Sequence, residues 1–312
     1  MRFPRIDSVL KKIIYPGMEV RAFVVTRLTQ VEIREKVFIK NDQQAIEITN
    51  RHCLACLDPF IMAIWLNEDE PATFNHHEIT LSVTRGNKQK ALIQLSLSEK
   101  FNENNIVILL YKVKDTKSLQ SNPLLRFITL ARFLKNKTST YRERKFIAAL
   151  YSYPRKVILV SYKEAGYFNL FPMDIQGDIS ANGIYLLGLR HSNITLQKIL
   201  ETKKILIGDT SKASIETIYS LGRHFSKSPP TIDSLPFEVS ESGLFKFPVP
   251  DFSSSYKEVE IIKNINLGYH MLLIGRIVNQ KQITEDLTSL YHIHFFEFIR
   301  SGYKAITNKG YS

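Results

Sequence analysis

The sequence contains only two cysteines, which excludes a disulfide-stabilised secreted scaffold. Cys53 and Cys56 form a C-x-x-C pair in "RHCLACLDPF", and the nearest further ligand candidates are His52, His76 and His77. A structural zinc site needs a second spaced pair, and a thioredoxin-like redox pair needs a βαβ pattern around it. Neither pattern occurs, so we expect both cysteines to be reduced structural residues and expect no bound metal.

Long apolar runs are also missing. No stretch of 18 or more apolar residues occurs, and the N-terminal segment "MRFPRIDSVLKKIIYPG" has neither a continuous apolar core nor a small-residue cleavage site. These patterns predict neither a transmembrane helix nor a signal peptide. We therefore expect a cytoplasmic protein with no membrane partner.

Several catalytic motifs are absent. No G-x-G-x-x-G follows a strand, so a dedicated Rossmann site for a nicotinamide nucleotide is not expected. Neither G-x-S-x-G nor H-E-x-x-H occurs, which disfavours an α/β-hydrolase and a zinc peptidase.

The chain has fewer acidic than basic residues, with 30 Asp and Glu against 42 Lys and Arg, which gives a net charge of +12. Between Arg126 and Lys156 only Glu143 opposes nine basic residues, which are Arg126, Arg132, Lys135, Lys137, Arg142, Arg144, Lys145, Arg155 and Lys156. This run is either the solvated face of a linker helix or a polyanion-binding surface. Because it lacks interleaved stacking aromatics and any known nucleic-acid-binding spacing, we do not expect a nucleic-acid partner.

Short β-branched or alternating runs fill the first part of the chain, from "MEVRAFVV" to "IVILLYKV", and Gly, Asn, Asp and Pro separate them. They predict a small β-sandwich or barrel in a β-rich accessory domain over residues 1–121. Residues 122–154 then show helical spacing in two segments, "NPLLRFITLARFLKN" and "STYRERKFIAALYSY". Pro123 lies near the start of the first and Pro154 just past the end of the second, for which Ser139 or Thr140 is a candidate N-cap. We expect a basic helical connector here.

Residues 155–312 again favour strands, with helices expected at "LQKILETKK" and "KASIETIYSLGRHFSK". An aromatic-rich loop is expected at "KEAGYFNLFPMD". The late strands follow one another in sequence, which indicates an antiparallel barrel decorated by helices instead of a parallel βαβ sheet. The chain as a whole is therefore predicted to be mainly β with helices.

Three short segments of this half carry polar groups that could serve one ligand. "YFNLFP" sets Asn169 among aromatic residues, which suits a flat ligand with a polar edge. "RHSNIT" brings a guanidinium, hydroxyls and an amide ahead of a helix, as an anion site would. "LGYHMLLIGRI" puts Tyr269 and His270 at the start of an apolar strand. Each segment also has a structural interpretation as a turn, an N-cap or a packed strand end.

The order of these segments resembles the flavin reductase-like, FMN-binding split-barrel family from Arg155 to about Tyr303. "VILVSYKEAGYFNLFPMD" is similar to the first strand and flavin loop, and "IYLLGLRHSNITLQKILETKKILIG" to the following strand, phosphate turn, helix and strand. The segment from Gly268 to Ile277 is similar to a G-x-H-x-x-x-I-G-x-V pattern. Phe168 and Leu170 replace the small polar residues common in the flavin loop, and the paired prolines before the second strand are lacking.

The resemblance implies a homodimeric six-stranded antiparallel split barrel that binds FMN, with FAD as an alternative, and takes hydride from NADH or NADPH. Backbone at Asn169, Leu170 and Phe171 would hold the flavin edge, and His270 with Tyr269 would approach the ring. The phosphate would be held by Arg190, Ser192, Asn193 and Thr195, with weaker candidates in Arg223, Ser226 and Lys227.

We therefore predict an NAD(P)H-dependent flavin reductase-like oxidoreductase that passes electrons to free flavin or another small acceptor. A non-catalytic FMN-binding sensor or interaction protein is the alternative. For the N-terminal half two alternatives stay open: an accessory β-domain, or a diverged barrel that packs against the first without binding flavin.

Overall fold

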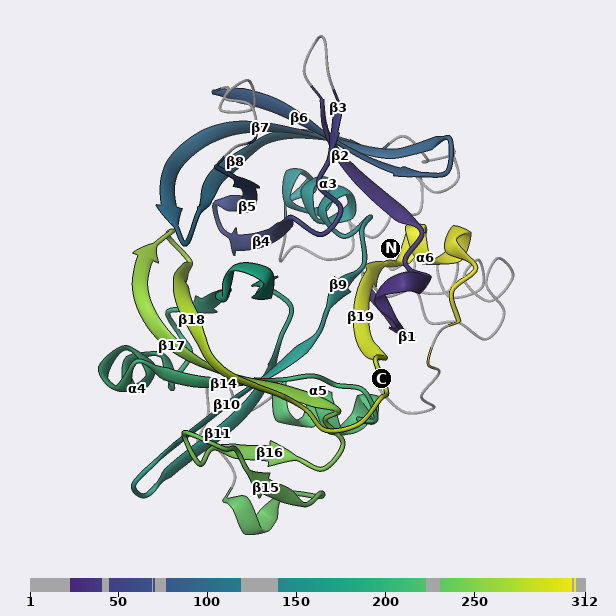
Figure 1. The fold of residues 1–312 in the computed structure, drawn as a ribbon. Coiled ribbons are helices and arrows are strands. Elements are labelled where there is room, and N and C mark those ends of the chain that lie inside the picture. Colours follow the sequence, from purple (N-terminus) through teal and green to yellow (C-terminus); the bar gives the residue numbers. More distant parts are fainter. Residues whose placement is uncertain are drawn as a thin grey trace, which may run out of the picture.

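A computed structural model describes residues 23–40, 45–68, 70, 77–118, 140–222, 231–304 and 306. Two curved seven-stranded antiparallel sheets dominate it (Figure 1). The predicted class, mainly β with helices, is confirmed. Within the described residues, no helix has the length and apolar character needed to cross a bilayer.

The N-terminal sheet is built from the first run of strands, in the spatial order β3-β2-β6-β7-β8-β5-β4. Its members are β2 (Glu35–Lys40), β3 (Ala45–Glu47), β4 (His52–Leu57), β5 (Phe60–Asn67), β6 (Glu78–Arg85), β7 (Lys88–Glu103) and β8 (Ile106–Ser118). Alternating apolar residues direct one side of this sheet toward a core that includes Met62, Ile64 and Leu109.

The C-terminal sheet has the spatial order β11-β10-β14-β17-β18-β13-β12. Its members are β10 (Ile158–Glu164), β11 (Tyr167–Met173), β12 (Gln176–Ile179), β13 (Ile184–Arg190), β14 (Lys204–Gly208), β17 (Ser255–Asn266) and β18 (His270–Gln282). Tyr185, Leu187 and Leu273 point into the core of this half.

The two sheets have the same topology. When the strands of each sheet are numbered in chain order, both sheets have the spatial order 2-1-5-6-7-4-3. All six pairings are antiparallel in each sheet. The N-terminal sheet therefore has the strand order expected of a diverged barrel, and its role stays a prediction.

The halves differ in their connections. In the N-terminal sheet, residues 86 and 87 alone join β6 to β7. The equivalent connection of the C-terminal sheet spans residues 209–254 and contains α5 (Ile215–Gly222), η4 (Ile232–Ser234), β15 (Val239–Glu241) and β16 (Pro248–Pro250). In the C-terminal half, η3 (Ser180–Asn182) lies between β12 and β13, and α4 (Leu196–Thr202) lies between β13 and β14.

Equivalent strands of the two sheets pack against each other. One shared apolar cluster draws on β4, β5 and β8 from one sheet and on β12, β13 and β18 from the other. Along β5 the alternation is complete, since Ile61, Ala63 and Trp65 face this shared cluster while Met62 and Ile64 face the N-terminal core. β5 is therefore buried on both faces, which explains its nearly continuous apolar sequence.

A three-stranded sheet brings together three segments that lie far apart in the sequence. It places β19 (Ser289–His294) between β1 (Phe23–Leu28) and β9 (Arg155–Lys156), and α6 (Phe295–Ser301) follows β19 directly. The 3-10 turn η1 (Gln30–Glu32) connects β1 to β2.

Only the second of the two expected connector helices falls within the described residues; the first, at "NPLLRFITLARFLKN", lies outside them. The second is α3 (Tyr141–Leu150), and it begins at the predicted cap, where Thr140 and Glu143 form a capping box. Phe146 and Leu150 insert into the N-terminal core, so α3 packs on the concave side of that sheet (Figure 1).

Arg155, in the predicted basic run, is buried and donates to the carbonyl of Leu150. The domain limits at 121 and 154 stay a prediction.

Candidate functional site

His270 is the most constrained of the predicted site residues. Its side chain is fully buried at the first position of β18, and its Nδ1 lies 3.4 Å from the backbone nitrogen of Leu57 and 3.5 Å from Cys56 Sγ. Because Leu57 donates to Nδ1, the neutral ring carries its proton on Nε2. Within the described part of the chain, Nε2 has no hydrogen-bond partner.

The charge state of His270 follows from this environment. Burial, and then the positive charge of Arg190, lowers the pKa of His270 to about 4. The imidazole is therefore neutral near pH 7, and its Nε2–H is a buried hydrogen-bond donor.

Arg190 and Tyr269 lie beside this histidine. Arg190, the last residue of β13, is directly opposite His270 in the β13–β18 register, and its guanidinium carbon lies 5.4 Å from the ring centre of Tyr269. Tyr269 is 45% exposed, and its backbone nitrogen donates to the carbonyl of Asp58 at 2.7 Å. The structure thus brings together three of the predicted residues: Arg190, Tyr269 and His270.

The predicted phosphate turn forms a hydrogen-bonded cluster of its own. Asn193 and Thr195 are buried, and Asn193 Oδ1 accepts the backbone N–H of Thr195 at 2.9 Å. Thr195 Oγ1 lies 2.7 Å from Asn169 Nδ2 and 2.9 Å from the Tyr167 hydroxyl. The backbone nitrogens of Asn193 and Leu196 also donate within the turn. These groups therefore hold the turn in shape, and Ser192 is the exposed one among the predicted phosphate ligands.

The expected aromatic loop is largely a strand. Residues Tyr167–Met173 form β11, which pairs with β10 along its whole length. Apolar side chains pack on both of its faces, with Phe171 in one cluster and Phe168 and Leu170 in another. Asn169, Leu170 and Phe171 are fully or almost fully buried. The backbone nitrogen of Leu170 donates to Asn169 Oδ1 at 2.9 Å.

Three weaker candidates, Arg223, Ser226 and Lys227, lie outside the described residues. Their role, like the binding roles of the other site residues, stays a prediction.

A second polar cluster was missed by sequence reasoning. His292 Nδ1 lies 2.7 Å from Asp174 Oδ2, and His292 Nε2 lies 2.9 Å from the hydroxyl of Tyr219. Tyr151 donates to the same carboxylate oxygen at 3.0 Å. His292 and Tyr151 hold the pKa of Asp174 below its usual range despite its burial. These residues come from distant parts of the sequence, so no spacing pattern could have indicated the cluster.

The two cysteines are free and buried, as expected. Burial raises the pKa of the Cys53 thiol to about 12 and also raises that of Cys56. The described residues contain no group of ligands that could hold a metal ion. Cys56 instead contacts the carbonyls of Asp58 and Leu267 as well as His270.

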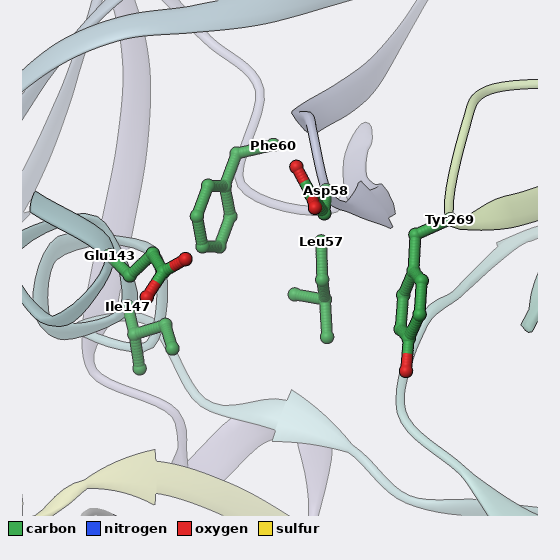
Figure 2. A pocket seen from close by; sticks show the side chains of 6 residues that line it. All are labelled: Leu57, Asp58, Phe60, Glu143, Ile147 and Tyr269. Atoms are coloured by element: carbon green, nitrogen blue, oxygen red, sulfur yellow. The ribbon is translucent and has the colours of Figure 1, made fainter. Parts of the chain in front are cut away.

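A cavity of about 240 Å³ opens beside Tyr269 at the junction of the two halves. Figure 2 shows Tyr269 on one side, facing the turn between β4 and β5, and two side chains of α3 on the other side. Its lining consists of Leu57, Asp58, Phe60, Glu143, Ile147 and Tyr269. This volume is below the roughly 300–1,000 Å³ of typical cofactor sites, so the cavity alone does not hold a whole flavin.

The residues of this site therefore suit the ring of a flavin better than its phosphate. The buried, unpartnered Nε2–H of His270 suits an acceptor atom on the polar edge of an isoalloxazine ring, and Arg190 supplies positive charge beside it. The side chains of Asn193 and Thr195 already have partners within the turn. At the ring end the structure thus offers a fully buried donor on His270, and at the phosphate end the exposed Ser192; the binding of FMN by these residues stays a prediction.

No family model and no curated protein sequence matches the chain. Among solved structures, an FMN-binding protein from Thermus thermophilus with bound 1-cyclohex-2-enone is similar over 42% of this chain and 72% of its own, with 18% identity and a TM-score of 0.37. Flavoredoxin from Methanosarcina acetivorans matches over 41% and 69%, with 18% identity and a TM-score of 0.36. The NADH:FAD oxidoreductase SgcE6 of Streptomyces globisporus matches over 53% and 93%, with 11% identity and a TM-score of 0.42.

These neighbours are flavin reductases and FMN-binding proteins, the class that the C-terminal half resembles in sequence. At such TM-scores the overlap is partial, so we take the functional inference from residues of this chain.

Proposed function

We propose that the C-terminal half binds a flavin, FMN in preference to FAD, and acts as an NAD(P)H-dependent flavin reductase-like oxidoreductase. The observation that carries the proposal is the Nε2–H of His270, a buried donor without a partner in the described residues. A buried unsatisfied donor costs roughly 1–3 kcal/mol, so a bound acceptor would recover that free energy. The sequence resemblance, which runs through the same segment, supports a flavin as the ligand that supplies this acceptor.

Each residue has a limited task in this proposal. His270 donates to the ring edge, and Arg190 offsets negative charge on the reduced ring or on the phosphate. Ser192 meets the phosphate from the exposed side of the turn, while Asn169, Asn193 and Thr195 fix the shape of that turn. Leu170 and Phe171 supply the rigid wall of β11. The flavin, when bound, supplies the redox chemistry, and the protein orients it and tunes its environment.

The reductant docks transiently in this account. Every strand pairing in the described residues is antiparallel, so the structure offers no parallel βαβ unit for a nicotinamide nucleotide. NADH or NADPH would approach beside Tyr269, the exposed member of the site. The electron acceptor is a second small molecule, such as free flavin, which binds beside Tyr269 after the oxidised nucleotide has left.

Visible absorption tests the proposal. FMN is added to the purified protein, and NADH or NADPH then follows under anaerobic conditions. We expect flavin bands that shift on binding and bleach with the nucleotide. Unchanged bands at saturating FMN would contradict the flavin site itself.

The burial of His270 favours a second candidate, a non-catalytic flavin sensor or interaction protein. A reductase needs an open face above the ring, and the His270 side chain has an exposed fraction of 0%. A flavin that binds but stays oxidised with either nucleotide would identify this second function.

The proposal also covers the location and the oligomeric state of the protein. We propose a cytoplasmic location, supported by two free, buried cysteines. The resemblance implies a homodimer, whereas the packing of two similar sheets within one chain supports a single chain instead.

A further inference from the structure

The two halves meet in the manner of a symmetric dimer. In a two-fold dimer, each subunit presents the same surface to the other. Here β4, β5 and β8 of the N-terminal sheet face β12, β13 and β18 of the C-terminal sheet, and these strands hold the same three places in the shared strand order. One chain therefore contains both sides of a self-complementary interface.

The contact is close enough to exclude a loose association. A Cβ atom on Gly188 of β13 would lie 2.5 Å from the carbonyl oxygen of Ala55 in β4. A Cβ atom on Gly268 would lie 2.9 Å from the carbonyl oxygen of Asp58. Glycine at both positions lets backbone from the two halves approach directly.

Strand register identifies which residues are equivalent in the two halves. The last residue of β13, Arg190, pairs with the first residue of β18, His270. In the N-terminal sheet, the last residue of β5, Asn67, pairs with the first residue of β8, Ile106. Asn67 and Ile106 thus occupy the places of Arg190 and His270.

Side-chain direction agrees with this equivalence. Ile106 belongs to the shared cluster together with Ile108, two residues further along β8. Leu272, two residues after His270 on β18, belongs to the same cluster. Because side chains alternate along a strand, Ile106 and His270 point to the same face of their sheets. The N-terminal half therefore has an apolar residue where the C-terminal half has its buried donor.

The N-terminal half nevertheless contributes to the site of the other half. Leu57 and Cys56, at the end of β4, supply the two groups that contact His270 Nδ1. The carbonyl of Asp58 accepts from the backbone of Tyr269. These contacts hold Nδ1 of the His270 ring against the N-terminal half.

We infer that the chain is a one-chain dimer with a single site: the N-terminal sheet takes the place of a second subunit, has no ligand site of its own at Asn67 and Ile106, and positions His270 through Cys56 and Leu57. The part that concerns His270 rests on the proposed flavin site. The part that concerns assembly does not.

Light scattering on the full chain, without added flavin, tests the assembly. We expect the mass of one chain, 36.0 kDa, across a wide concentration range. A mass of two chains would overturn the inference, because a second copy would then complete the fold or the site. This result does not depend on whether a flavin binds.

Nitrogen NMR of the imidazoles tests the positioning. The chain has eight histidines, and the spectrum of a His270→Ile variant assigns the signals of His270. We expect an unprotonated Nδ1 and a protonated Nε2 at neutral pH, because the Leu57 N–H occupies Nδ1. A protonated Nδ1 would overturn the positioning role. Flavin added in excess should then shift the Nε2 signal alone, and a chain with the expected mass and tautomer but no flavin shift would contradict the proposed function instead.

Discussion

Cys56 and His270 lie 214 residues apart in sequence, yet Cys56 Sγ and His270 Nδ1 are 3.5 Å apart across the junction of the two sheets. Both groups are neutral near pH 7, because burial raises the pKa of the thiol and lowers that of the imidazole. The pair is therefore a positioning contact and not an activated nucleophile. This contact links the N-terminal half, which has Ile106 at the equivalent place, to the C-terminal half, which has the His270 donor.

Replacing His270 with Ile gives the C-terminal half the residue that the N-terminal half has at the equivalent place. The Nε2 donor is lost while an apolar side chain of similar reach keeps the strand end filled. We expect FMN affinity to fall by roughly five- to 150-fold, from the loss of about 1–3 kcal/mol, with the melting temperature little changed. Flavin fluorescence titration measures the affinity, and an unchanged dissociation constant would make the histidine purely structural.

Replacing Arg190 with Ala should weaken FMN binding by roughly ten- to a hundredfold, as expected for one charge-assisted contact of about 1.5–3 kcal/mol. Arg276→Ala is the matched control, because Arg276 lies at the other end of the same strand pair, opposite Ile184, and is exposed. Equal affinities for the two variants would remove Arg190 from the ligand site.

Stability should fall between pH 6.5 and pH 4. His270 and His52 have pKa values lowered from 6.5 to about 4 and about 3, so the unfolded chain binds protons in this range that the folded chain does not. Protonation therefore favours unfolding, and the stabilising effect of the neutral rings is complete above pH 6.5. Urea unfolding across this range measures the slope, which His270→Ile should make shallower. An identical slope in the variant would contradict the lowered pKa.

Asp174→Asn tests the cluster around His292. Because the pKa of Asp174 is held below its ordinary 3.8, its ionised form contributes stability above that pH, and the contribution is lost as pH falls through the lower folded value. The variant should therefore be less stable than the parent chain at pH 7, and the difference should shrink below about pH 4. A difference that is the same at both pH values would show that charge is not involved.

Gly188→Ala tests the closeness of the two sheets. The added methyl group meets Ile175 and the backbone of Ala55, so we expect a loss of about 1–3 kcal/mol in the free energy of unfolding. Gly208→Ala is the control, because there the nearest atom is a serine hydroxyl oxygen at 3.2 Å. Equal losses for both variants would contradict a tight junction.

The sequence predicted much of the local structure. Alternating apolar residues indicated the strands, and Ser139 or Thr140 was the candidate cap of α3. In the structure the cap is Thr140, which forms a capping box with Glu143. The similar order of strands in the two halves was not predicted, because it depends on pairings between strands far apart in the chain. The neutral Cys56–His270 contact and the Asp174–His292–Tyr219 cluster were missed for the same reason.

The "RHSNIT" turn shows a different limit. A polar turn before a helix has the same composition whether its groups meet a ligand or one another. In the structure Asn193, Thr195 and Asn169 hydrogen-bond to one another, which depends on how β11 packs beside the turn. Sequence spacing could not separate the two cases.

A visible spectrum of the wild-type protein and the His270→Ile variant, each titrated with FMN, tests the flavin site most directly. We predict shifted flavin bands with saturable binding for the wild-type chain and much weaker binding for the variant. No change in the bands of FMN at saturating wild-type protein would contradict the account.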